Sequence, residues 1–67
     1  PTSMMLAHNV ASAAQVDSVM ATAEAAGAHV LKPARATDWG GYAGYFQDPD
    51  QHAWEVAFNP QWEVPSD

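Results

Sequence analysis

The chain has 67 residues, enough for one small domain and no more. Eight acidic residues against two basic ones, Lys32 and Arg35, give a net charge of −6, which argues against nucleic acid or an anionic membrane as a partner. No cysteine is present, so disulfides and thiolate metal sites are excluded. A domain this small is marginally stable, and we expect support from oligomerisation, a hard-ligand metal site or further protein sequence.

The sequence contains no sign of a membrane span or an export signal. No apolar run approaches the roughly 20 residues that cross a bilayer, and no secretory pattern is visible at the start. We therefore expect a cytoplasmic protein. Residues 1–67 are interpreted as a single domain with a core at about 4–60 and a polar tail at 61–67.

Residues 4–10 predict the first strand, because they are short and apolar apart from His8 and Asn9. Alternation puts Leu6, His8 and Val10 on one face of this strand.

A helix is predicted over about residues 13–26. Ser12 followed three residues later by Gln15 is a capping-box pattern, and the alanine-rich composition favours a helix. An apolar stripe of mostly small residues follows at helical spacing: Val16, Val19, Met20, Ala23 and Gly27. Gly27 is also well placed to end the helix in a left-handed conformation.

Three further strands are predicted after the helix. Residues 28–32 form the first of these, ended by Pro33, and residues 33–39 form a loop. The other two strands, at about 42–47 and 52–58, are joined by a tight turn, Asp48-Pro49-Asp50-Gln51.

Glu55 is the sharpest chemical feature of the last strand. Alternation sends its carboxylate to the face opposite Trp54, Val56 and Phe58. A carboxylate on a strand face is a hard oxygen ligand for a divalent metal, or a general base. The alternative is a solvent-facing residue on an open sheet, and periodicity alone leaves both interpretations standing.

The predicted order of elements is strand-helix-strand-strand-strand, and residues 48–56 read D-P-D-Q-H-A-W-E-V. Together these features resemble one βαβββ module of the vicinal oxygen chelate superfamily. That superfamily includes glyoxalase I, bleomycin-resistance proteins, fosfomycin-resistance enzymes and extradiol dioxygenases. The resemblance covers about residues 4–60 and is strongest to the C-terminal half of a glyoxalase-like domain. It implies an α+β fold with a cupped mixed sheet, one helix on its outer face, and a second module that completes the site.

The resemblance also implies site residues. In metal-dependent members, the Glu after the aspartate-proline-aspartate turn is a metal ligand, which corresponds here to Glu55, and a His of the first strand is the other ligand, matched by His8. The metal would be Zn, Ni, Mn or Fe. Two departures stand out: Gln51 replaces the usual turn glycine, and the length is half that of a two-module domain. Either the chain belongs to a longer protein or two chains form the domain, as a homodimer.

Aromatic residues form a second group of candidates. Trp39, Tyr42 and Tyr45 are candidates to line a pocket for a small-molecule ligand, against the alternative of burial in a core or interface. Lys32 and Arg35 could meet an anionic substrate, although solubilising or salt-bridging roles are the commoner explanation for such a pair. His29 and His52 are interpreted as structural or exposed.

Three functions are consistent with these features. The first is a glyoxalase-like metal-dependent lyase, isomerase or dioxygenase acting on a small molecule with vicinal oxygens, with Glu55 and His8 binding the metal. The second is a metal-free small-molecule binding or bleomycin-resistance-like protein. The third is a half-module without a site. Kinship of fold does not decide among them, and enzymatic activity stays open.

Overall fold

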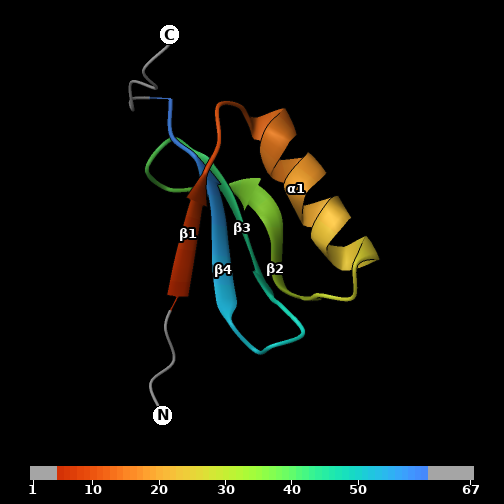
Figure 1. Cartoon of the computed structure of the whole chain (residues 1–67). Helices are drawn as coiled ribbons and strands as arrows, with labels where there is room; N and C mark the ends of the chain where they lie inside the picture. Colours follow the sequence, from red (N-terminus) through yellow and green to blue (C-terminus); the bar gives the residue numbers. More distant parts are fainter. Residues whose placement is uncertain (1–4, 61–67) are drawn as a thin grey trace, which may run out of the picture.

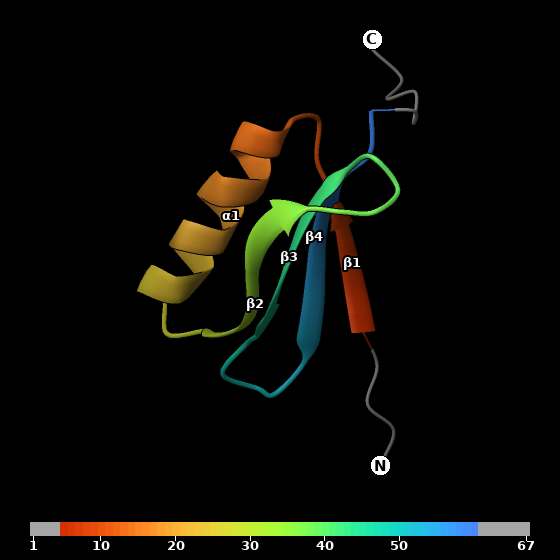
Figure 2. The same cartoon turned by 180° about the vertical axis from the view of Figure 1, so that it is seen from behind.

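The computed structural model describes residues 5–60 of the chain, and these form one helix packed on one sheet (Figures 1 and 2). The elements in chain order are β1 (Met5–Asn9), α1 (Ala13–Ala25), β2 (His29–Ala36), β3 (Tyr42–Gln47) and β4 (Ala53–Phe58). The predicted α+β fold, a βαβββ module with a mixed sheet and one helix, is confirmed.

The sheet has the strand order β1-β4-β3-β2, so the first and last strands of the chain lie side by side. β1 runs parallel to β4, whereas β3 is antiparallel to both β4 and β2. α1 lies across one face of the sheet, over β2, β3 and β4, and the other face carries no helix (Figure 1). β1 and β2 are therefore the two edge strands.

A small core fills the space between α1 and the sheet. It consists of Val16 and Met20 from the helix and Phe46 and Val56 from β3 and β4, each at most 9% exposed. The helix approaches the sheet closely because β3 carries Gly44 beneath Met20. Burial of these side chains contributes roughly 1.5–3 kcal/mol each to the free energy of folding.

Both ends of α1 are closed as the sequence predicts. Ser12 Oγ accepts a hydrogen bond from the Gln15 amide at 3.1 Å, and Gln15 Oε1 accepts one from the Ala11 amide at 2.8 Å. Gly27 has φ +103°, and the amides of Gly27 and Ala28 donate to carbonyls of the last turn in a Schellman arrangement. At 13 residues, this helix lacks the length and apolar character to cross a membrane, and it is the only helix between residues 5 and 60.

The prediction that Pro33 ends the second strand is wrong. β2 continues through Pro33 to Ala36, and its pairing with β3 shifts register between Val30 and Lys32 and again between Lys32 and Arg35. Pro33 is tolerated because β2 is an edge strand, where a missing N–H breaks no ladder on the outer side. The loop predicted for residues 33–39 is correspondingly shorter and begins at Thr37.

The turn between β3 and β4 forms as predicted around Asp48 and Pro49. The Gln51 amide donates to the Asp48 carbonyl at 2.8 Å, and the Asp48 amide donates to the His52 carbonyl at 2.9 Å. Gln51 has φ +71°, the conformation in which glycine is favoured. The turn therefore forms although Gln51 replaces the usual glycine, and Gln51 adopts a left-handed backbone conformation.

Candidate functional site

The open face of the sheet, opposite α1, carries the polar side chains that define the candidate site. On β4, Trp54 and Val56 face the helix, so Glu55 projects from the open face. On β3, Tyr45 is the direct cross-strand neighbour of Glu55. The predicted orientation of Glu55, away from the apolar face, is thus what the sheet geometry produces.

Tyr45 and Glu55 form a hydrogen-bonded pair. The Tyr45 hydroxyl donates to Glu55 Oε2 at 3.1 Å, and both side chains are partly buried. Burial, together with this hydrogen bond and the neighbouring negative charge, raises the pKa of the Tyr45 phenol above its ordinary value. Within residues 5–60 no group donates to Glu55 Oε1, so this oxygen can accept a hydrogen bond or proton from a ligand on the open face.

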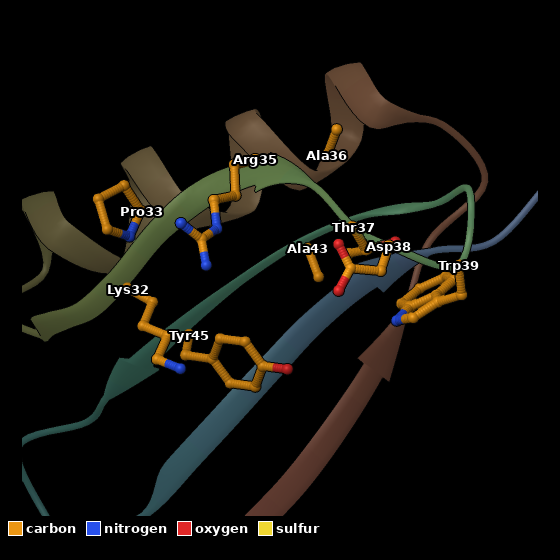
Figure 3. A pocket seen from close by; sticks show the side chains of 9 residues that line it. All are labelled: Lys32, Pro33, Arg35, Ala36, Thr37, Asp38, Trp39, Ala43 and Tyr45. Atoms are coloured by element: carbon orange, nitrogen blue, oxygen red, sulfur yellow. The ribbon is translucent and has the colours of Figure 1, made fainter.

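A cavity of about 480 Å³ lies beside this pair, between β2 and the loop that follows it (Figure 3). Its volume falls within the roughly 300–1,000 Å³ typical of small-molecule pockets. The lining combines basic, acidic and aromatic side chains: Lys32, Pro33, Arg35, Ala36, Thr37, Asp38, Trp39, Ala43 and Tyr45. Tyr45 therefore links the cavity to Glu55.

The loop from Thr37 to Gly41 positions Trp39 at one end of the cavity. Thr37 and Gly41 exchange hydrogen bonds: the Gly41 amide donates to Thr37 Oγ1 at 2.9 Å, and the Thr37 amide donates to the Gly41 carbonyl at 3.0 Å. A Cβ at residue 41 would clash with the Trp39 ring and with the Phe58 carbonyl. Glycine at this position is what allows the indole to lie against the backbone.

Lys32 and Arg35 both project from the open face, because they pair with Tyr45 and Ala43 on β3. The Lys32 ammonium lies over the Tyr45 ring, 5.7 Å from its centroid. No ion pair between residues 5 and 60 involves Arg35, whose guanidinium extends over the sheet on the same side as Lys32 (Figure 3).

The structure does not bring all the predicted site residues together. Trp39 and Tyr45 line the cavity and Glu55 adjoins it. Tyr42 instead lies on the helix side, where its hydroxyl donates to Asp17 Oδ1 at 2.9 Å, since it is three residues from Tyr45 on a regular strand. Its predicted role in ligand binding has no support in this placement.

His8 likewise lies on the other face from Glu55. The parallel pairing of β1 with β4 sets His8 beside Val56, and Ala7 beside Glu55. The two predicted metal ligands of this module therefore do not converge. Among the described residues no group of three metal-ligating side chains includes Glu55, so any metal bound by Glu55 needs ligands from a second module.

Three metal-ligating side chains do gather at the β3–β4 turn. Ligand atoms of Asp48, Asp50 and His52 lie within 4.8 Å of one another. Asp48 is already engaged, because Oδ1 accepts from the His52 amide at 2.8 Å and Oδ2 from the Trp54 indole at 3.0 Å. The indole and amide hydrogen bonds, the first most strongly, hold the pKa of the Asp48 carboxyl below its ordinary value. These hydrogen bonds account for the grouping of the three side chains as part of the turn, without a metal ion.

The structure groups Lys32 and Arg35 at the cavity, which the sequence pattern does not predict. In a regular strand, residues three apart face opposite sides, so periodicity gives no reason to group them. The two register shifts in β2 place both on the open face. The only sequence signal is that Pro33, a residue associated with strand irregularities, lies between them.

Comparison with known proteins identifies the family. Residues 2–56 match the model of the Glyoxalase/Bleomycin resistance protein/Dioxygenase superfamily, and the chain belongs to that superfamily. Divalent metals are common cofactors in this superfamily, and the predicted metal site of this chain rests on that general property. None of the curated proteins compared with the chain matches it.

Solved structures with the same fold are about twice as long. A glyoxalase-related enzyme from Fulvimarina pelagi is 49% identical with a TM-score of 0.88, and the match covers 100% of this chain and 48% of that one. A glyoxalase/bleomycin resistance protein/dioxygenase family enzyme from Burkholderia phytofirmans PsJN is 24% identical with a TM-score of 0.78, covering 87% and 46%. A hypothetical protein, SA1046, from S. aureus is also 24% identical with a TM-score of 0.78, covering 88% and 45%. The chain thus spans about half the length of these structures.

Proposed function

We propose that this chain provides half of a small-molecule binding site on the open face of its sheet, with a second module supplying the other half. The observation that carries the proposal is the Tyr45–Glu55 pair, a hydrogen-bonded carboxylate on the uncovered face beside a cavity of about 480 Å³. The half-length match to two solved relatives supports the need for a second module.

Glu55 is the residue that meets the ligand. Tyr45 fixes one carboxylate oxygen, which leaves the other to accept a hydrogen bond from a ligand hydroxyl, amide or acidic C–H group. The site therefore suits a ligand with a hydrogen-bond donor group. Trp39 and Tyr45 add aromatic surface.

The test is ligand binding by chelator-treated protein. A panel of small aromatic and hydroxylated molecules is screened by thermal shift, and hits are mapped by NMR chemical shifts. We expect the shifts to cluster on Tyr45, Glu55 and the Thr37–Gly41 loop, and Glu55→Gln to weaken binding. Hits that map to the outer surface of α1, or that bind Glu55→Gln unchanged, would refute the proposal.

A metal-dependent lyase or isomerase is the second candidate, favoured by the position of Glu55 on the open face. Glu55 would be the only ligand from this module, and the remaining ligands would come from the second module, because His8 lies on the opposite face. Bound Zn, Ni, Mn or Fe that is lost in Glu55→Gln but kept in His8→Ala would favour this candidate over the first.

A further inference from the structure

Both basic residues of this acidic chain lie in the cavity beside the Tyr45–Glu55 pair. We propose that this cavity binds the anionic group, carboxylate or phosphate, of a small organic acid, with Lys32 and Arg35 as its charge partners and Trp39 against its apolar part. The proposal rests on the proposed function and adds the chemical class of the ligand.

The first argument is the backbone of β2. Lys32 and Arg35 are three residues apart, a spacing that directs side chains to opposite faces of a regular strand. The register shift between them brings both onto the open face, opposite Tyr45 and Ala43. An irregular edge strand containing Pro33 thus concentrates both positive charges of the chain at one place.

The second argument is that Arg35 has no carboxylate partner within the described residues 5–60. Among residues 5–60 the only ion pair joins His52 and Asp48, at the far turn. A planar guanidinium without an ion pair can bind a carboxylate or phosphate through two parallel hydrogen bonds. Lys32, held over the Tyr45 ring, supplies a second positive charge on the same side of β2 (Figure 3).

The third argument concerns the shape of the cavity and its apolar end. Trp39 is 47% exposed and is fixed against Gly41 at the end of the hollow away from Lys32 (Figure 3). A cavity of about 480 Å³ with cations at one end and an indole at the other fits a small acid with an aromatic or otherwise flat body.

One carboxylate lines the cavity, a second adjoins it, and the first limits where the anionic group can lie. Asp38 lines the cavity next to Trp39, and Glu55 holds the Tyr45 hydroxyl. Asp38 repels an anion from the Trp39 end, so the acid group lies at the Lys32 and Arg35 end. Neutralising Asp38 should therefore strengthen binding, in contrast to any change at Arg35.

The experiment compares naphthoate, naphthyl phosphate and the neutral naphthamide by NMR chemical-shift titration of the purified protein at low salt. We expect both acids to bind at least about 10-fold more tightly than naphthamide, the contribution of one charge-assisted contact. The better of the two identifies carboxylate or phosphate as the preferred group. Added salt should weaken the acids and leave the amide unchanged.

Variants then test which charged side chains contribute to acid binding. Arg35→Met should weaken acid binding about 10-fold without affecting naphthamide, Arg35→Lys should weaken it less, and Asp38→Asn should strengthen it two- to three-fold. An unchanged spectrum outside the cavity confirms that each variant folds.

Several results would overturn the proposal. Equal binding of acid and amide would refute the anion preference while leaving small-molecule binding intact. Absence of binding by all three probes would count against both. If Arg35→Met altered the sedimentation of the protein and left acid binding unchanged, the cations would serve an interface between copies instead.

Discussion

Tyr45 is the residue on which the candidate site depends. Its ring lies under the Lys32 ammonium, its hydroxyl is bound to Glu55, and its edge lines the cavity. Two neighbours of opposite charge, Lys32 and Glu55, thus contact one side chain at the wall of the cavity. The neutral phenol suits this position, because the phenolate would face the Glu55 carboxylate.

The ionisation of Tyr45 should be visible in the stability of the protein. The pKa of Tyr45 is higher in the folded protein than the value of about 10 expected in the unfolded chain. The folded state is therefore stabilised at pH values below the unfolded pKa, and this stabilisation is lost as the pH rises through the folded pKa. The pKa of Tyr42 is also raised, first by its hydrogen bond to Asp17. Urea unfolding between about pH 8 and pH 12 should show a decline that Tyr45→Phe and Tyr42→Phe each reduce.

Direct titration provides the control. These are the two tyrosines of the chain, so the tyrosinate absorbance of each single variant reports the other residue alone. A midpoint at or below about 10 in Tyr42→Phe would contradict the environment described for Tyr45.

Gln51 carries backbone strain at the β3–β4 turn. Its φ of +71° costs a side-chain-bearing residue roughly 1–2 kcal/mol, and glycine adopts it freely at an entropic cost of about 0.5–1 kcal/mol. We expect Gln51→Gly to raise the free energy of unfolding by about 0.5–1 kcal/mol, measured by urea denaturation. Gly27→Ala, at φ +103° with no neighbour within 4 Å of a new Cβ, is the control and should destabilise.

At the scale of elements, the contact of α1 with β3 depends on Gly44. A Cβ there would lie 3.0 Å from the Met20 sulfur and 3.1 Å from the Ala34 Cα. Met20 can move aside, whereas the β2 backbone at Ala34 cannot move without disturbing the sheet. We expect Gly44→Ala to lower the free energy of unfolding by about 1–3 kcal/mol.

A double-mutant cycle separates the two contacts of Gly44. Met20→Ala alone leaves a cavity and should cost about 2–5 kcal/mol. If crowding against Met20 contributes, the double variant should lose less stability than the sum of the single changes. Additive losses would assign the whole effect of Gly44→Ala to the β2 backbone.

The elements differ in how far their sequence predicts them. The helix is well predicted because its signals are local: Ser12 and Gln15 at one end and Gly27 at the other. Alternation likewise gives the orientation of Glu55. The sequence pattern ends the second strand at Pro33, whereas β2 continues to Ala36. The effect of a proline depends on whether the strand lies at a sheet edge, which is a property of the whole sheet.

The candidate site is less predictable than the fold, for the same reason. The grouping of Lys32 and Arg35 follows from register shifts that only pairing with β3 defines. The separation of His8 from Glu55 follows from the parallel register of β1 with β4, elements more than forty residues apart in the chain. Local patterns contain neither kind of information, whereas the superfamily resemblance identified the fold but not these placements.

At the scale of the molecule, β1 is the edge at which we expect a second module to join. Within the part of the chain that the structure describes, no strand pairs with the outer side of β1 and α1 does not cover it, and Met5 on it is 55% exposed. β2, the other edge, is irregular and contains Pro33, so it is a poor template for pairing. The open face would then curve around a space shared by two modules, each contributing one Glu55.

Sedimentation equilibrium tests whether the chain pairs with itself through β1. We expect a mass of twice the 7.2 kDa of the chain, since a second copy is the partner that is available to the purified 67-residue chain. Met5→Lys should shift the equilibrium toward monomer, because a charge on an edge strand opposes pairing. Leu31→Lys, at a 45% exposed apolar residue on the opposite edge, is the matched control and should leave the mass unchanged. Loss of the dimer in Leu31→Lys but not in Met5→Lys would show that the interface lies at β2. The cavity of Lys32 and Arg35 would then lie at the contact between copies.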